Sequence, residues 1–367
     1  MERHGIANVM KYMLPLGRTY YDTTAQRLHM NWTCSGVEFI FRGTCLTADF
    51  EAYAGHELDR DGMGNTHERP TWPWVAVFLD DGDEPYQRFE LTNSRQTSLI
   101  FASETEETHR IRIVKLTENL KTGVSLCSFS SQGAFLEKQP SAHKAIEFIG
   151  DSITCGFGNE TQDRNRVFYA AEENGWYSHA AIAARQLDMD WSMVCVSGIC
   201  LAPCRAIPLP YAMKELYEYT DRILHDRMGK APQRWDFSAH PADYVVVNLG
   251  TNDTTGIMAR EDYEAAEEEF HKAYLDFLQT VRACRGKSTV IICAIGSMDY
   301  YLYHRLTQIV QEYCQAKGDQ NVYCFRYPRI SVMDPLGACG HPHVTTHKKM
   351  AQALVRFIEK LETEKRS

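Results

Sequence analysis

The pattern of apolar residues changes near residues 139–143, and this change constrains the fold more than any other feature of the chain. Before it, apolar residues form short runs bounded by turn-forming residues, with almost no helical period. From Ala145 onward, strand-like runs alternate with segments of helical period. A chain of 367 residues is also longer than one typical hydrophobic core supports. The sequence therefore predicts two domains, at residues 1–140 and 141–367.

The first domain is predicted to consist of β-strands. Strand-like runs occupy residues 36–41, 75–79 and 109–114, and the last of them alternates apolar and polar residues. Residues 80–83, Asp-Asp-Gly-Asp, are typical of a hairpin turn after the second run. Many short strands without helices are typical of a β-sandwich, and we expect a jelly roll.

The second domain is predicted to have an α/β fold. Helical patterns cover residues 175–187, 260–285 and 345–361, and they alternate with five apolar runs of strand length, at 145–149, 191–196, 244–249, 289–294 and 322–325. This alternation is typical of βαβ units, which build a parallel sheet between layers of helices. Open sheets of this kind bind ligands beyond the carboxyl ends of their strands.

Four loops of the second domain carry residues suited to acyl-transfer chemistry. Gly150-Asp151-Ser152 follows the first strand, Gly198 follows the second, Asn252 follows the third, and His341 precedes the last helix. All four loops can meet in one crevice at the carboxyl edge of the sheet. Each motif also has a simpler interpretation, since Gly-Asp-Ser and Gly198 suit ordinary turns and Asn252 suits a helix cap. A serine nucleophile is the hypothesis that unites them.

The order and spacing of these four blocks over residues 145–361 resemble the SGNH (GDSL-like) hydrolases. In the first domain, Gly17-Arg18 and the run Trp32-x-x-Ser35-Gly36-Val37-Glu38-Phe39 narrow the resemblance to carbohydrate esterase family 2. Leu216-Tyr217, Trp235-Asp236-Phe237 and the stretch from His341 to Ala351 also look like that family. The family resemblance implies acetyl esterases in which a jelly roll precedes the SGNH domain.

The resemblance implies a role for each of the four blocks. Ser152 would be the nucleophile, and His341 would be its general base and then the acid that protonates the leaving sugar hydroxyl. The amides of Ser152 and Gly198 and the side-chain amide of Asn252 would form the oxyanion hole. No cofactor is implied.

One position departs from the hydrolase pattern. Many SGNH enzymes place an Asp two or three residues before the histidine, where it orients the imidazole. This chain has Cys339 and Ala338 there, and Asp334 is poorly spaced for the task. Some family members resemble Ser–His dyads whose imidazole is held by a backbone carbonyl. The sequence leaves open which group orients His341.

The C-terminal histidines and two tryptophans raise further possibilities. His341, His343 and His347 form a His-x-His-x-x-x-His pattern, but no carboxylate or cysteine pair joins them at ligand spacing, so we expect no metal. Trp176 and Trp235 are candidates for a sugar-binding platform. Packing inside the domain is the alternative for both of these side chains.

Composition excludes some partners and suggests a compartment. The formal net charge of −9 argues against a nucleic acid held by its phosphates. No apolar run approaches the about 18 residues of a membrane span. The N-terminal residues do not resemble an export signal, and the twelve cysteines often lie in apolar runs. We therefore expect a cytoplasmic protein, and the sequence does not reveal its oligomeric state.

These observations together predict a serine esterase that removes O-acetyl groups from acetylated oligosaccharides of the mannan or xylan type. One alternative is an esterase or acetyltransferase acting on another acyl ester. A second alternative is a carbohydrate-binding protein whose hydrolase domain is inactive, for which the missing Asp is the main support.

Overall fold

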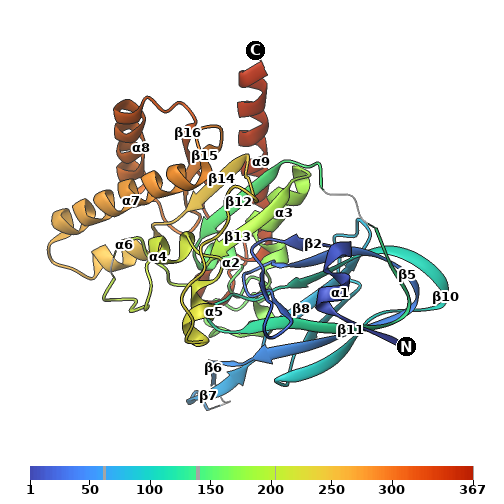
Figure 1. The fold of residues 1–367 in the computed structure, drawn as a ribbon. Coiled ribbons are helices and arrows are strands. Elements are labelled where there is room, and N and C mark those ends of the chain that lie inside the picture. Colours follow the sequence, from blue (N-terminus) through green and yellow to red (C-terminus); the bar gives the residue numbers. More distant parts are fainter. Residues whose placement is uncertain (61–62, 138–140, 203, 367) are drawn as a thin grey trace. The chain divides into compact units, whose positions relative to one another are not determined.

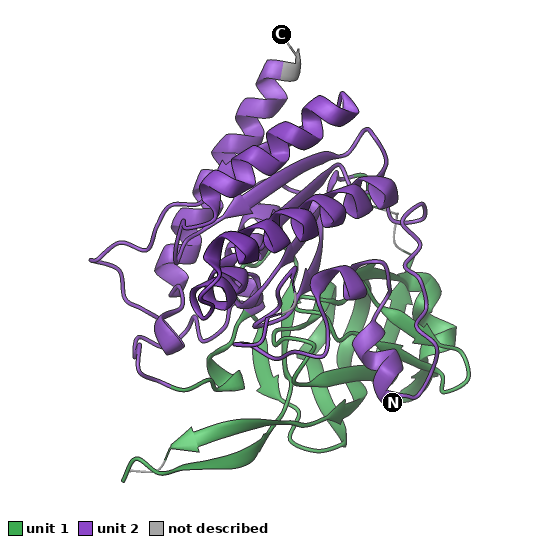
Figure 2. Ribbon diagram, turned by 90° about the vertical axis from the view of Figure 1, so that its left-hand side faces the viewer, with its two compact units in different colours: residues 1–142, 167–174 green, residues 143–166, 175–367 purple. Residues whose placement is uncertain are grey.

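A computed structural model describes residues 1–60, 63–137, 141–202 and 204–366 of the chain (Figure 1). The chain divides into two units: residues 1–142 with 167–174, and residues 143–166 with 175–367 (Figure 2). The boundary expected at residue 140 lies outside the described residues, and the division falls two residues later. The inclusion of residues 167–174 in the first unit was not expected from the sequence.

The first unit is built from antiparallel strands. Nine of them form one sheet, in which β3, β4, β11, β5, β10, β8 and β9 are successive neighbours, while β1 pairs with β11 and β2 with β5. Strands β6 and β7 form a separate hairpin. The strands are β1 (Glu2–Gly5), β2 (Met13–Leu16), β3 (Tyr20–Asp22), β4 (Arg27–His29), β5 (Gly36–Tyr53), β6 (Gly55–Arg60), β7 (Thr66–Thr71), β8 (Trp74–Leu79), β9 (Gln87–Glu90), β10 (Arg95–Lys115) and β11 (Gly123–Leu136), with one short helix, α1 (Ile6–Val9).

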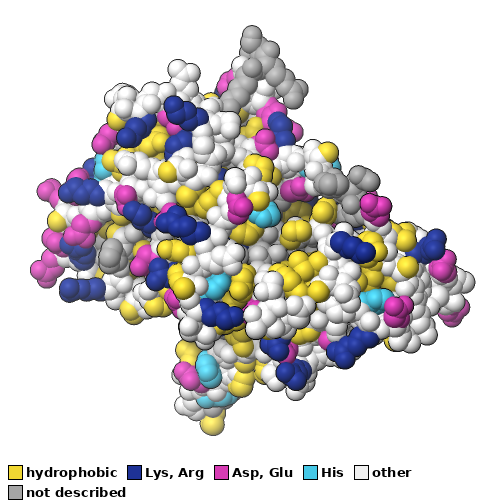
Figure 3. All heavy atoms as spheres, in the orientation of Figure 1, with side chains coloured by type: hydrophobic (Ala, Val, Ile, Leu, Met, Phe, Trp, Pro, Cys, Tyr) yellow, Lys and Arg dark blue, Asp and Glu magenta, His cyan; other side chains and the backbone are white. Residues whose placement is uncertain are grey.

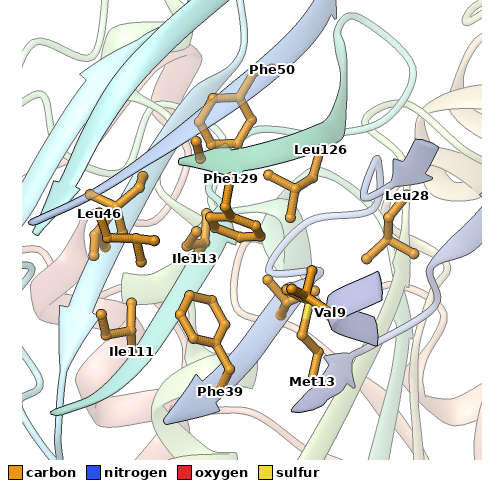
Figure 4. Close-up of a cluster of buried hydrophobic side chains, with 14 of the residues drawn as sticks. Val9, Met13, Leu28, Phe39, Leu46, Phe50, Ile111, Ile113, Leu126 and Phe129 are labelled. Atoms are coloured by element: carbon orange, nitrogen blue, oxygen red, sulfur yellow. The ribbon is translucent and has the colours of Figure 1, made fainter. Parts of the chain in front are cut away.

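The core of this unit lies between two halves of the same long strands. Along β5 the buried apolar residues change phase at Gly43, where the pairing with β10 and β11 shifts register: they are Val37, Phe39 and Phe41 before it and Leu46, Ala48 and Phe50 after it. Such a shift bends a strand and lets both halves face one core. Side chains from several strands fill that core (Figure 4). The predicted β-sandwich is confirmed, and its long bent strands replace the short ones expected.

The segment 167–174 is held within the first unit by hydrogen bonds. The amide of Ala170 donates to Glu57 Oε2 at 2.9 Å, and Glu173 Oε2 accepts from the amide of Glu118 at 2.9 Å. The chain thus leaves the second unit after Arg166 and returns to it at Gly175.

The second unit contains a five-stranded parallel sheet in the order β13-β12-β14-β15-β16. Its strands lie within about a residue of the predicted runs: β12 (Ala145–Gly150), β13 (Asp190–Cys195), β14 (Tyr244–Asn248), β15 (Val290–Ile295) and β16 (Val322–Arg326). Strand β13 lies on one side of β12, and β14 lies on the other side of β12. The direction in which successive strands are added to the sheet therefore reverses after β13. At such a switch of direction the loops beyond the two strands separate, which is where open sheets of this kind bind ligands. The predicted α/β fold is confirmed.

Helices flank this sheet as two packed pairs. Helix α3 packs against α9, and α7 packs against α8. Right-handed crossovers place the two pairs on opposite faces of the sheet. The helices are α2 (Ser152–Cys155), α3 (His179–Gln186), α4 (Met213–Tyr217), α5 (Arg222–Arg227), α6 (Thr251–Met258), α7 (Tyr263–Arg285), α8 (Tyr303–Lys317) and α9 (Val344–Arg366). The helix predicted at 175–187 is interrupted at Ser178, whose hydroxyl caps α3 by accepting from Ala181.

Surface charge and helix hydropathy agree with the composition. On the face in Figure 3, Lys and Arg side chains are interspersed with Asp and Glu rather than gathered in one basic patch. In the described part of the chain, no helix has both the length and the hydropathy needed to span a bilayer.

Candidate active site

Ser152 is the first residue of α2, directly beyond the carboxyl end of β12. Asp151 caps this short helix, because its Oδ1 accepts the amide of Ile153 at 2.9 Å. Gly156 ends the helix with a φ of 79°, a left-handed conformation that glycine adopts without strain. The Gly-Asp-Ser turn therefore holds the serine at the edge of the sheet, and Asp151 shapes the turn as its residue type suggests.

His341 meets Ser152 from the loop before α9. Its Nε2 lies 2.9 Å from Ser152 Oγ, and its Nδ1 lies 3.0 Å from the carbonyl oxygen of Ala338. Because a carbonyl can only accept, Nδ1 carries the proton, and Nε2 is free to accept from the serine hydroxyl. The ring also packs against Phe157, with 4.4 Å between ring centroids. The main chain of Ala338 is thus the group that orients the imidazole.

The Ala338 carbonyl is positioned by contacts between two loops. The amide of Ala338 donates to the carbonyl of Gly158 at 3.1 Å, and the amide of Cys339 donates to that of Arg166 at 3.1 Å. Gly158 has a φ of 53°, and a Cβ on it would lie 2.3 Å from the Cβ of Ala338. The loop after α2 therefore supports the turn that carries the acceptor of His341.

Asp334 does not serve the imidazole. Its carboxylate accepts from Lys349 Nζ at 2.5 Å and from the hydroxyl of Thr346 at 3.3 Å. The Lys349 ammonium holds the pKa of this carboxyl below its ordinary value, so Asp334 is an ionised anchor for the start of α9.

Gly198 lies on the loop after β13, as predicted, and Asn252 is the second residue of α6, the helix that follows β14. Gly198 has a φ of 81°, which favours glycine. Asn252 Nδ2 donates to the carbonyl of Ile199 at 3.0 Å and approaches Asp151 Oδ2 at 3.5 Å. In the described part of the chain, the amides of Ser152 and Gly198 donate to no other residue. The structure brings these groups to one edge of the sheet, while their role in an oxyanion hole stays a prediction.

Asn252 is not the helix cap that was the alternative interpretation. The N-cap position of α6 is Gly250, and no side chain caps that helix. The side-chain amide of Asn252 instead donates to the carbonyl of Ile199, the residue after Gly198.

Asp253 holds the loop that follows Gly198, a role that the sequence does not reveal. Its carboxylate is buried and accepts the amides of Leu201 and Ala202, each at 3.0 Å, so it holds the loop that follows Gly198. Burial raises the pKa of Asp253 to about 6. Burial also raises the pKa of Asp151 to about 7, and the charges of Asp253 and Asp299 add to that effect.

The three C-terminal histidines have separate partners. His343 Nδ1 lies 3.0 Å from Thr345 Oγ1, whereas His347 Nδ1 accepts the amide of His179 at 3.0 Å. Across residues 1–60, 63–137, 141–202 and 204–366, no group of three metal-ligating side chains is placed to hold an ion.

The interpretation of Trp176 as a sugar platform is wrong. Its side chain is 1% exposed, so no ring face is open to a ligand. The ring packs edge-to-face on Trp191 with centroids 5.7 Å apart, and the Arg185 guanidinium lies 4.0 Å from its centroid. Trp176 is a packing residue of the second unit.

Trp235 is partly exposed but lies toward the other end of the sheet. Its ring stacks on His240 with centroids 4.2 Å apart, and the carbonyl of His240 accepts from Arg285. Arg285 in turn pairs with Glu147, near the start of β12, at 2.6 Å. Since Ser152 follows the far end of that strand, no contact among the described residues joins Trp235 to Ser152, and its assignment to the substrate site stays a prediction.

Two family models match the chain, one for each part. Residues 146–354 match the GDSL-like Lipase/Acylhydrolase family, and residues 16–140 match the Carbohydrate esterase 2 N-terminal domain. The chain belongs to the GDSL-like lipase/acylhydrolase family. The resemblance drawn from the four blocks and the first domain is confirmed.

The relatives of this chain include two named enzymes. It is 29% identical over 335 residues to the cellulase/esterase CelE of Acetivibrio thermocellus, a match that covers 89% of this chain and 37% of that protein. It is 24% identical over 265 residues to an acetylxylan esterase/glucomannan deacetylase of Cellvibrio japonicus, covering 68% of this chain and 69% of the relative. The esterase thus spans little more than a third of the length of CelE.

Solved structures of family 2 esterases share the whole fold. A carbohydrate esterase from Clostridium thermocellum, solved in complex with cellohexaose, superposes with a TM-score of 0.81 at 28% identity and covers 96% of this chain and 99% of its own. An acetyl xylan esterase from Butyrivibrio proteoclasticus has a TM-score of 0.82 at 22% identity, with 98% of both chains covered.

Proposed function

We propose that the chain is a serine esterase that removes O-acetyl groups from acetylated oligosaccharides of the mannan or xylan type. The observation that carries the proposal is the hydrogen-bonded series from Ser152 Oγ through the imidazole of His341 to the carbonyl of Ala338. The substrate class is supported by the relative named as an acetylxylan esterase/glucomannan deacetylase.

In the first step, Ser152 Oγ attacks the carbonyl carbon of the acetyl group while its proton passes to His341 Nε2. The negative charge on the carbonyl oxygen would be held by the amides of Ser152 and Gly198 and by the side chain of Asn252. When the tetrahedral intermediate collapses, His341 gives the proton to the sugar oxygen that leaves. The product is acetyl-Ser152.

In the second step, a water molecule replaces the sugar. His341 Nε2 takes a proton from this water, whose oxygen attacks the acetyl-enzyme, and the same proton returns to Ser152 Oγ as acetate leaves. In both steps the imidazole becomes positively charged for a moment. The Ala338 carbonyl stabilises that charge through the Nδ1–H hydrogen bond.

The proposal is tested by removing the nucleophile. We expect Ser152→Ala to lower kcat by about 10⁴-fold or more on acetylated glucomannan, acetylated xylan and 4-nitrophenyl acetate, because no other group can form the acyl-enzyme. An organophosphate should label the unchanged protein at Ser152 and leave the variant unlabelled. Full activity of Ser152→Ala would refute the mechanism. Turnover of 4-nitrophenyl acetate with no release of acetate from acetylated manno- or xylo-oligosaccharides would refute the substrate class.

The alternative of an inactive carbohydrate-binding protein has lost its main support. It rested on the missing Asp before His341, and the carbonyl of Ala338 occupies that role. Binding of an acetylated oligosaccharide without release of acetate, together with no organophosphate adduct, would restore it.

A further inference from the structure

Three buried side chains meet behind the loop that carries His341. His179 is the first residue of α3, His347 lies in the first turn of α9, and Tyr327 follows the last residue of β16. The two imidazole rings are parallel with centroids 5.6 Å apart, and the Tyr327 ring meets His179 edge-on at 4.8 Å. Each of the three side chains is 0% exposed.

Four polar atoms of this cluster have no hydrogen-bond partner among the described residues. They are Nδ1 and Nε2 of His179, Nε2 of His347 and the hydroxyl oxygen of Tyr327. A buried polar group without a partner is costly, and native proteins leave very few of them. Four such atoms on three neighbouring side chains therefore indicate at least one further partner.

The donors and acceptors of the cluster can be assigned. His347 Nδ1 accepts the amide of His179 at 3.0 Å, so the ring proton of His347 is on Nε2, which is a donor. A neutral His179 offers one donor and one acceptor, and Tyr327 offers both. Burial lowers the pKa of His179 to about 3 and that of His347 well below its ordinary value, so both rings are neutral near pH 7.

We propose that His179, His347 and Tyr327 form a binding site for at least one buried water molecule. A water molecule donates two hydrogen bonds and accepts two, which matches a cluster that offers donors and acceptors together. The neutrality of all three side chains favours an uncharged ligand over an ion. The inference does not depend on the acetyl esterase activity.

The bound water links α9 to α3. Helix α9 begins three residues after His341, and His347 is on its first turn. Water-mediated hydrogen bonds are nearly as favourable in enthalpy as direct ones. The water therefore holds the start of α9, and with it the anchor of the catalytic loop, against the helix that covers the same face of the sheet.

The sign of the change in Tm on Tyr327→Phe tests the proposal. If the hydroxyl binds water, its removal leaves that water with fewer bonds, and we expect the Tm of the full chain to fall by about 2–4 °C. If the Tyr327 hydroxyl has no partner at all, its removal relieves a cost and the Tm stays constant or rises. A Tyr327→Phe variant whose Tm equals or exceeds that of the unchanged protein would overturn the proposal.

A crystal structure of the unchanged protein gives a second, direct test. We expect an ordered water about 2.7–3.2 Å from His347 Nε2 and from the hydroxyl of Tyr327. A direct hydrogen bond between the side chains with no water would overturn the proposal. A Tm that rises with added Zn²⁺ and falls with a chelator, both reversed in His179→Leu, would replace the water by a metal ion.

Discussion

At the scale of single residues, the hydrogen-bonded pair of Ser152 and His341 is completed by the dipole of a carbonyl group instead of the charge of a carboxylate. A carboxylate next to an imidazole stabilises its charged form by Coulomb attraction, whereas the carbonyl of Ala338 offers a hydrogen bond alone. His341 therefore depends more on the fixed geometry of its loop, and on the contact with Phe157, than a triad histidine does.

Asn252 is the residue whose role the geometry leaves to experiment. We expect Asn252→Ala to lower kcat on 4-nitrophenyl acetate by about 10²–10³-fold with little change in KM, because an oxyanion donor acts mainly in the transition state. The control is Thr255→Ala, an exposed change on the same helix, which should keep normal activity. A decrease in kcat of less than tenfold would show that Asn252 does not stabilise the oxyanion and only donates a hydrogen bond to the carbonyl of Ile199.

At the scale of elements, the loop after α2 determines where the Ala338 carbonyl lies. Gly158→Ala would place a Cβ 2.3 Å from the Cβ of Ala338, so one of the two loops must move. We expect this variant to have a lower Tm and a lower kcat than the unchanged protein. Gly229→Ala is the matched control, since Gly229 has a φ of 63° and nothing within 4 Å of its added Cβ. Both variants carry a backbone strain of about 1–2 kcal/mol, and only Gly158→Ala should impair turnover. Equal kcat values in the two variants would contradict this coupling.

The sequence predicted the positions of helices and strands better than it predicted the contacts between side chains that are distant in the chain. The central strands β12, β14 and β15 are buried on both faces, so their apolar runs mark them to within about a residue, and three of the four blocks follow the ends of strands. The acceptor of His341 could not be found because every residue type supplies a carbonyl. Trp176 could not be separated from a ligand-binding tryptophan, since the same side chain serves packing and sugar binding. The segment 167–174 joins the first unit through hydrogen bonds to Glu57 and Glu118, more than fifty residues earlier in the chain, which no local pattern reveals.

At the scale of the whole molecule, buried histidines link stability to pH. The pKa of His179 is about 3 in the folded chain, and the ordinary value of about 6.5 applies after unfolding. Between these values the unfolded chain binds a proton that the folded chain excludes. The stabilisation is therefore complete above pH 6.5 and is lost as the pH falls toward 3. The raised pKa of Asp151 acts in the opposite direction, since its folded form holds a proton up to about pH 7.

A comparison of two proteins isolates the contribution of His179. We expect the free energy of unfolding of the unchanged protein, minus that of His179→Leu, to decrease by about 1.4 kcal/mol for each pH unit below 6.5. Urea unfolding at pH 6.5, 5.5 and 4.5 measures this difference, and the contribution of Asp151 cancels because both proteins contain it. Parallel pH profiles would show that His179 is protonated in the folded chain.

The hydrogen-bond acceptor of His341 has a consequence for how the sequence can evolve. The acceptor is a main-chain carbonyl, which every residue type provides. Substitution at residue 338 alters a methyl group and leaves the oxygen in place, so a single mutation cannot delete the third member of the relay as it can delete an aspartate. Selection then acts on the shape of the turn, which keeps a small side chain at Ala338 because that residue is buried against Gly158. A sequence search that requires an acid before the histidine would miss the acceptor that His341 has in this chain.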